Sequence, residues 1–149
     1  MKMTRILPPF WALIYLAVGI LSHFFWLWSR NSGFPLPLFG ALSLALGFTV
    51  MTSAWLLFHK KGTSVCPTEP STHFVTEGPY RFTRNPMYLG MTLILLGIAF
   101  FLATPPTFFM PLAFFFTMNA TFVPYKERKM EGTFGEAYRQ YKRHVRRWI

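Results

Sequence analysis

The residues best suited to chemistry lie between positions 77 and 90, where arginine, tyrosine, glycine and proline gather just ahead of a long apolar run. Gly78-Pro79 is a turn signal, and Pro86 suits the first turn of a helix, where its missing N–H is not needed. Asn85 comes immediately before Pro86 and is a candidate to cap that helix. The pattern predicts a polar loop that leads into a membrane helix at the boundary between lipid and water.

A helix that begins in this way can bind polar or anionic groups, because its N-terminus carries free N–H groups and positive partial charge. Arginine and tyrosine are also common lipid anchors at this depth, so a site and a membrane anchor are both compatible with these residue types. The candidate site residues are those of the loop together with an acid and a base farther along the chain: Tyr80, Arg81, Arg84, Asn85, Tyr88, Glu127 and Arg128.

Several common kinds of site have no counterpart in the sequence. We find no glycine-rich phosphate loop, no dinucleotide-binding fingerprint and no serine nucleophile elbow. No histidine and cysteine spacing typical of a metal site is present, and the single Cys66 excludes an internal disulfide. We therefore expect no metal.

The elements that must position the loop are membrane helices. Of the 149 residues, 52% are hydrophobic, 19% aromatic and 13% charged, which is too apolar for a soluble domain of this size. The length indicates a single domain over residues 1–149. The net charge of +10 comes from basic residues that flank apolar runs, a placement that favours anionic lipid headgroups over nucleic acid.

Apolar runs predict four transmembrane helices, since about 20 residues suffice to cross a bilayer. The first covers residues 6–28 and the second residues 36–58. The next uncharged stretch is divided by Thr104-Pro105-Pro106-Thr107, which predicts a hairpin of two helices over residues 86–103 and 107–123.

Individual residues in these runs carry further expectations. Gly40, Leu44 and Gly47 fall near one face of the second helix, so we expect it to pack closely in the middle of the bundle. Asn119 is polar at membrane depth and needs a partner. His23 is expected to bond to a neighbouring helix rather than to act in catalysis.

Residues 124–149 carry apolar side chains at helical spacing and eight basic residues, which predicts an amphipathic surface helix. With four spans, this segment, the loop and both termini share one side, and Arg30 is the one lysine or arginine on the other. The positive-inside rule then places both termini in the cytoplasm, and we expect the inner membrane of a bacterium. The fold class is therefore an all-α membrane protein with about four transmembrane helices and a C-terminal amphipathic cytoplasmic helix.

Two motifs resemble those of a known family. Residues 75–80, read Val-Thr-Glu-Gly-Pro-Tyr, and residues 84–90, read Arg-Asn-Pro-Met-Tyr-Leu-Gly, are similar to the signature of the isoprenylcysteine carboxyl methyltransferases and related bacterial phospholipid methyltransferases. The C-terminal pattern with Phe134-Gly135 and Arg147-Trp148 resembles the closing motif of the same family. The resemblance covers residues 72–149, in which two separate motifs occur in the right order.

The resemblance implies an integral-membrane methyltransferase that uses S-adenosylmethionine and acts on a lipophilic small molecule or lipid. The implied cofactor contacts are His73, Phe74, Val75, Tyr80, Asn85, Pro86, Met87 and Tyr88. An acidic pair usually completes the pocket, and here it is Lys126-Glu127, which makes Glu127 the acid in register. Lys126 could neutralise Glu127 or extend to the headgroups. Phe122 stands where the eukaryotic carboxyl methyltransferases have a substrate-binding arginine.

The implied catalytic residues are Arg84, Tyr88 and Glu127. An arginine can hold a carboxylate acceptor with two parallel hydrogen bonds, and no base is then needed. An amine acceptor must lose a proton, and Glu127 or Tyr88 would be the base. Two other functions stay open: a sterol-type membrane reductase that uses a nicotinamide dinucleotide, and a membrane scaffold without catalysis.

Overall fold

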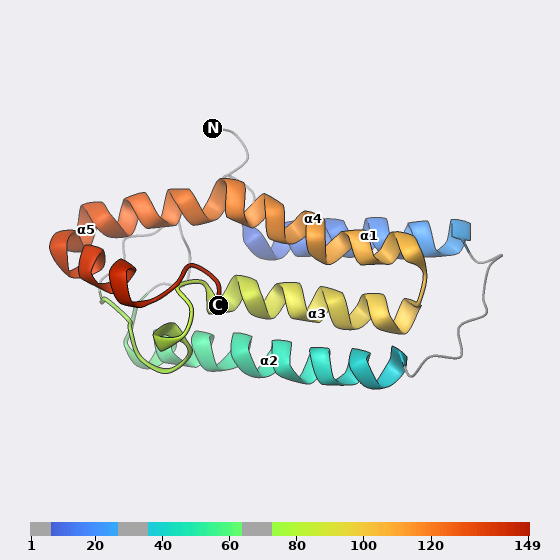
Figure 1. Cartoon of the computed structure of the whole chain (residues 1–149), viewed down its shortest axis with the longest axis horizontal. Helices are drawn as coiled ribbons and strands as arrows, with labels where there is room; N and C mark the ends of the chain where they lie inside the picture. The colour runs from blue at the N-terminus through green and yellow to red at the C-terminus, as the bar shows by residue number, and fades with distance from the viewer. Residues whose placement is uncertain (1–6, 27–35, 64–72) are drawn as a thin grey trace.

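The computed structural model describes residues 7–26, 36–63 and 73–149, and this part of the chain is helical, without β-strands (Figure 1). The α-helices are α1 (Pro8–Trp26), α2 (Leu36–Lys60), α3 (Pro86–Leu102), α4 (Phe109–Thr117) and α5 (Val123–His144). Shorter elements are the 3₁₀ helices η2 (Gly78–Arg81) and η3 (Pro105–Phe108) and the π-helix η4 (Met118–Phe122). The prediction of an all-α protein is confirmed.

Apolar helices of membrane-spanning length confirm an integral-membrane protein. Three stretches of the described residues qualify by length and composition: Pro8–Phe25, Pro37–Lys60 and Pro105–His144. The apolar helix α3 is somewhat shorter, at 17 residues. The last stretch has 40 residues, about twice the number needed to cross the hydrocarbon region, and its helical path is interrupted at Gly135. Since the charge-free part of that stretch ends at Tyr125, we expect Lys126 and the residues after it to lie outside the bilayer.

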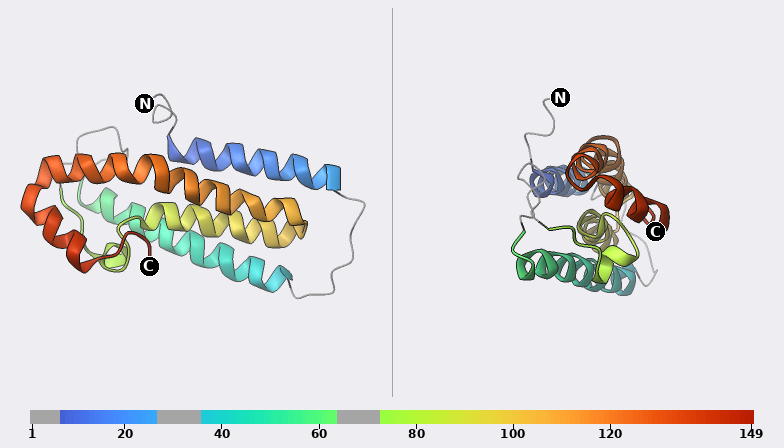
Figure 2. Two further views of the ribbon diagram at one scale, coloured as in Figure 1. Left: turned by 45° about the horizontal axis from the view of Figure 1, so that its top comes forward. Right: turned by 90° about the vertical axis from the view of Figure 1, so that its left-hand side faces the viewer.

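The central helix of the bundle is α3, which contacts α1, α2 and α4 (Figures 1 and 2). Helix α2 packs on α3 along a glycine seam, where a Cβ added at Gly47 would lie 2.8 Å from the carbonyl oxygen of Gly90. Close packing through the glycine face is therefore confirmed. The expected central position of α2 is wrong. Its small residues Gly40 and Gly47 pack against α3 alone, and Leu42 and Leu46 on its other side are exposed.

The predicted hairpin is confirmed between α3 and α4. Ala103 adopts a left-handed conformation with φ of 52° and ends α3, and η3 begins at Pro105. The Thr107 hydroxyl donates to the carbonyl oxygen of Thr104 at 2.6 Å, which tightens the turn. His23 Nδ1 lies 3.4 Å from the hydroxyl of Thr104, so His23 bonds to a neighbouring element, as expected.

The C-terminal segment differs from the predicted surface helix at both ends. Helix α5 continues from α4 through the π-helix η4, so no break separates it from the membrane helix. At Gly135 the backbone departs from helical geometry, with φ of 52° and ψ of −122°, and the chain turns back towards the bundle (Figure 2). The helix ends at His144, because Val145 is extended.

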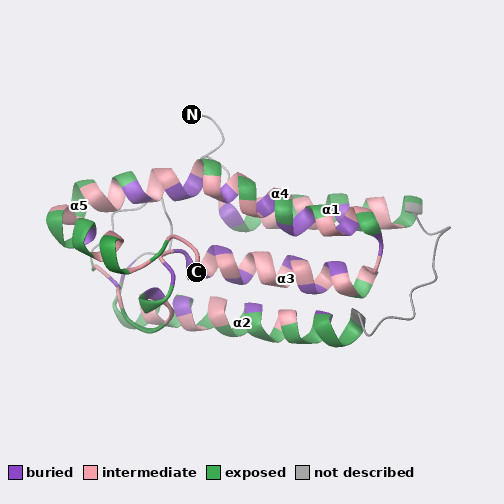
Figure 3. Cartoon of the chain, viewed as in Figure 1, coloured by how far each residue is buried: buried purple, intermediate pink, exposed green. Residues whose placement is uncertain are grey.

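Buried side chains form two clusters, and Figure 3 shows how burial concentrates on the inward faces. The larger cluster joins α3 to α4 and α5 through Tyr88, Leu95, Phe114, Met118, Phe122 and Val123. The smaller one joins α2 to the loop before α3 through Ala54, Val75 and Tyr80. Tyr88 in the first cluster and Met87, which packs against the second, both belong to the first turn of α3, so the two clusters together anchor the loop that precedes it.

Candidate functional site

Four segments converge at one end of the bundle (Figures 1 and 2). They are residues 77–85, which we call the motif loop, the N-terminus of α3, the first turns of α5, and residues 145–149, which we call the C-terminal tail. The tail returns from α5 and lies against the motif loop, as its hydrogen bonds show below.

The tail is attached to the motif loop through its backbone carbonyl groups. The Arg84 N–H donates to the carbonyl oxygen of Arg146 at 3.0 Å. The hydroxyl of Thr83 and the side-chain amide of Asn85 both donate to the carbonyl oxygen of Arg147, at 3.2 and 3.0 Å. Asn85 occupies the N-cap position of α3, but its side chain makes no capping hydrogen bond there. The predicted side-chain cap is therefore wrong, since the side chain is oriented towards the tail, to which its amide group donates.

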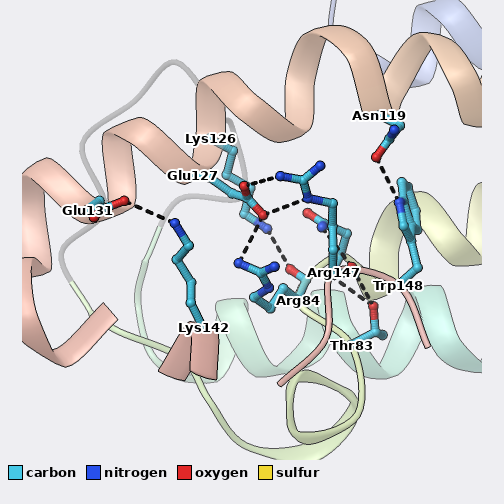
Figure 4. A network of polar contacts seen from close by, with 10 residues as sticks. Thr83, Arg84, Asn119, Lys126, Glu127, Glu131, Lys142, Arg147 and Trp148 are labelled. Atoms are coloured by element: carbon cyan, nitrogen blue, oxygen red, sulfur yellow. Dashed lines mark hydrogen bonds and ion pairs between the residues drawn. The ribbon is translucent and has the colours of Figure 1, made fainter. Parts of the chain in front are cut away.

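Glu127 links α5 to both of these segments (Figure 4). Arg147 binds it with two hydrogen bonds, from Nε to Oε1 at 3.1 Å and from Nη2 to Oε2 at 2.7 Å. Nη1 of Arg84 lies 3.1 Å from Oε1. The Glu127 side chain is only 9% exposed, and its charge is balanced by two guanidinium groups, of which that of Arg84 is buried and that of Arg147 is half-exposed.

Arg84 is not fully satisfied by this pair. Its Nε is buried and has no hydrogen-bond partner in the described part of the chain, although Nη1 faces Glu127. A buried donor without an acceptor is unfavourable. A bound ligand with an acceptor oxygen or nitrogen would satisfy it, and this distinguishes Arg84 from an arginine that only anchors headgroups.

Lys126 turns inward beside Glu127. Its Nζ donates to the carbonyl oxygen of Arg84 at 3.2 Å and lies 5.6 Å and 5.9 Å from the ring centroids of Tyr80 and Tyr88. Burial lowers the pKa of Lys126 to about 8; Glu127 opposes this effect and Arg84 adds to it. Of the two roles suggested by the sequence, extension to the headgroups is therefore wrong, because the ammonium is held inside the protein.

Phe74, another predicted cofactor residue, packs against aromatic side chains of α5. Phe74 stacks on Phe134 with ring centroids 5.1 Å apart and meets the edge of Tyr141. The hydroxyl of Tyr141 donates to the carbonyl oxygen of Tyr80 at 2.6 Å. Burial raises the pKa of Tyr80 and of Tyr141 well above the ordinary range, so both stay neutral.

The structure therefore brings most of the predicted site residues together. Tyr80, Arg84, Tyr88 and Glu127 surround Lys126. Val75 and Met87 belong to the apolar cluster behind Tyr80, and Pro86 is buried at the start of α3. His73 is exposed at the edge of the described residues.

The sequence did not assign Arg147 and Trp148 to the site. The indole N–H of Trp148 donates to Oδ1 of Asn119 at 3.0 Å, and its ring lies 4.4 Å from that of Phe115. Asn119 thus has the partner that its depth required, and that partner comes from the tail. The available signal was the closing Arg147-Trp148 pair, but nothing in the spacing indicates that the tail folds back.

Fold and site together define an integral-membrane helical protein with a charged cluster at the mouth of its central helix. A family model described as phospholipid methyltransferase matches residues 36–137, which includes α2, the motif loop, α3, α4 and most of α5. The chain belongs to this family, so its class is that of membrane methyltransferases.

Other known proteins add little to this assignment. An uncharacterised protein of Haemophilus influenzae is 35% identical over 63 residues, which are 42% of this chain and the whole of the relative. No solved structure matches the chain.

Proposed function

We propose that the protein transfers a methyl group from S-adenosylmethionine to a lipophilic acceptor at the cytoplasmic membrane surface. The observation that supports this most directly is the meeting of Tyr80, Arg84 and Tyr88 with Lys126-Glu127 at the end of the apolar helices. These residues belong to the part of the chain that matches the family. The end of the apolar helices is also where a polar donor in water and an acceptor in lipid can meet.

The residues present fit such a donor. The ammonium of Lys126 already lies over the rings of Tyr80 and Tyr88, so this place accepts a cation. Arg84 Nε offers an unmet hydrogen-bond donor to an acceptor atom of the ligand. When bound, S-adenosylmethionine supplies an electrophilic methyl carbon on a sulfonium, which a nucleophile can displace directly.

The protein contributes chiefly by positioning. Arg84 is held from both sides, by Glu127 at its side chain and by the tail carbonyl of Arg146 at its N–H. Such fixed groups can supply a large part of the barrier reduction for a direct displacement. Because both oxygens of Glu127 face guanidinium groups, we assign Glu127 to the positioning of Arg84 and Arg147 rather than to proton transfer.

Binding of the cofactor can be tested by thermal unfolding of the detergent-purified protein. We expect S-adenosylmethionine to raise the unfolding temperature, because a ligand that binds only the folded state stabilises it, whereas NADPH should not. Stabilisation by NADPH alone would favour the reductase. Stabilisation by neither, at millimolar concentrations, would favour a scaffold without catalysis.

A further inference from the structure

The rings of Tyr80 and Tyr88 face one cation from two different elements. Nζ of Lys126 lies 5.6 Å and 5.9 Å from their centroids, within the range of about 6 Å in which an aromatic face attracts a cation. Tyr80 is 4% exposed and Tyr88 is 7% exposed. Each ring belongs to a separate apolar cluster, so the protein core, and not the lysine, holds the two rings in place.

Within the described residues, the ammonium of Lys126 makes no ion pair with a carboxylate. Both oxygens of the adjacent Glu127 are bonded to arginines, with Arg84 on Oε1 and Arg147 on both. The bond that Lys126 makes is to a neutral carbonyl oxygen, that of Arg84, at 3.2 Å. One hydrogen bond to a neutral group and two aromatic faces stabilise a buried cation only weakly. The same aromatic faces would also attract a permanently charged organic cation.

We propose that Lys126 is a resident cation in an onium-binding site: its ammonium fills a place between Tyr80 and Tyr88 that takes the sulfonium group of a methyl donor once the lysine moves out or loses its proton. The identity of the natural ligand rests on the proposed function, but the onium site does not. In this arrangement Lys126 sets the affinity for the donor, and it makes that affinity depend on pH.

The direction of the pH dependence follows from the groups that face Lys126, which are Tyr80, Tyr88, Arg84 and Glu127. Burial lowers the pKa of Lys126 to about 8, and so it loses its charge as the pH rises from 7 to 9. Burial also raises the pKa of Tyr80, and its ring remains neutral over this range. The competing cation therefore disappears at high pH, and an onium ligand should bind more tightly at pH 9 than at pH 7.

The test uses trimethylsulfonium as the probe, because this ion is permanently charged and has no titratable group. Binding to the full chain in detergent is measured by calorimetry at pH 7 and 9. Lys126→Met keeps the length of the side chain and removes its charge. We expect this variant to bind about tenfold more tightly than the wild type at pH 7, the scale of one cation–aromatic contact, and to lose the pH dependence.

The matched control is Lys60→Met, which removes an exposed lysine at the end of α2 and should leave affinity and pH dependence unchanged. Equal or weaker binding by Lys126→Met would overturn the proposal, as would equal tightening by Lys60→Met. If Lys126→Met does not fold, the affinity of the wild type for trimethylsulfonium at pH 7 and 9 is the deciding measurement. An affinity that is the same at both pH values would also overturn the proposal.

A parallel titration with S-adenosylmethionine separates this proposal from the proposed function. If trimethylsulfonium binds as expected while neither the wild type nor Lys126→Met binds S-adenosylmethionine, the onium site stands and the methyl-transfer proposal fails. If the wild type binds S-adenosylmethionine and Lys126→Met gains no affinity for either ligand, methyl transfer stands and the role of Lys126 is refuted.

Discussion

Glu127 is the carboxylate that neutralises two arginines of the site. Arg84 and Arg147 come from the motif loop and the tail, and both meet the same carboxylate. Their side chains are 11% and 40% exposed, so removal of the acid would leave one positive charge buried and a second one half-buried. A buried pair is costly to break even where its net contribution to stability is small.

We therefore expect Glu127→Gln to destabilise the protein by about 3 kcal/mol, the scale of a broken buried ion pair. The measurement is thermal or denaturant unfolding in detergent. Glu131→Gln is the matched control, because Glu131 lies one helical turn further on and pairs with Arg139 and Lys142 at a more exposed position. Equal stability of the two variants would show that Glu127 does not hold the loop and the tail together.

Residue types in the sequence pointed to a polar cluster at the membrane boundary, and the resemblance to a known family suggested that this cluster is a site. Arg84, Tyr88 and Glu127 were recognisable because arginine, tyrosine and acid residues stand at the ends of apolar runs. The inward turn of Lys126 was not predictable, since a lysine at a membrane boundary can extend to the headgroups equally well. The inward conformation depends on the two tyrosine rings and on the carbonyl oxygen of Arg84, which become neighbours of Lys126 only in the folded chain.

At the scale of elements, the C-terminal tail completes the site although it is not helical. Its carbonyl groups accept hydrogen bonds from Thr83, Arg84 and Asn85. Trp148 fixes its end by bonding to Asn119 in the π-helix η4. π-Helical turns within α-helices frequently occur at functional sites, and this one ties the membrane helix to the tail.

Loss of that attachment should release the tail. Trp148→Ala removes the hydrogen bond to Asn119 and the ring contact with Phe115, so we expect a loss of about 1–3 kcal/mol in stability. The released tail should also become sensitive to carboxypeptidase. Ile149→Ala, at the 79% exposed neighbouring position, is the control and should behave as the wild type; resistance of Trp148→Ala to digestion would contradict the attachment.

The elements themselves were predictable to different degrees. The hairpin followed from Thr104-Pro105-Pro106-Thr107, because consecutive prolines cannot continue a helix. The end of α5 did not, because residues 145–149 contain apolar and basic residues that suit an amphipathic helix. The chain leaves the helix there because hydrogen bonds to the motif loop, which is distant in sequence, replace the helical ones.

At the scale of the whole molecule, charge sorts to one end of the bundle. Basic residues gather beyond one end of the apolar helices, in the motif loop, α5 and the tail (Figure 1). Helix α2 ends on the same side, at Lys60, with Lys61 directly after it. We expect this end to face the cytoplasm, because positive residues are retained on that side. Both termini should then be cytoplasmic.

Reporter fusions test this orientation. A periplasmic reporter fused to the C-terminus should be inactive, whereas the same reporter placed after Thr104, in the turn between α3 and α4, should be active. An active C-terminal fusion together with an inactive one at Thr104 would reverse the orientation and place the site on the outer side, away from the cytosolic cofactor.

The central claim is that the cluster around Arg84 and Tyr88 transfers a methyl group to a lipophilic acceptor. The most direct measurement incubates the purified protein with S-adenosylmethionine carrying a labelled methyl group and with a total lipid extract, and follows label in the organic phase. Arg84→Ala and Tyr88→Phe are the variants to compare, since Glu127 keeps Arg147 in the first and the aromatic ring remains in the second.

The account predicts a labelled lipophilic product with the wild type and at least tenfold less product with either variant, the range typical for loss of a positioning or proton-handling group. Both variants should remain folded, as judged by their unfolding transitions. Label transfer by both variants at the wild-type rate would remove this cluster from the reaction, and an absence of labelled product with the folded wild type would contradict methyl transfer to a lipid-phase acceptor.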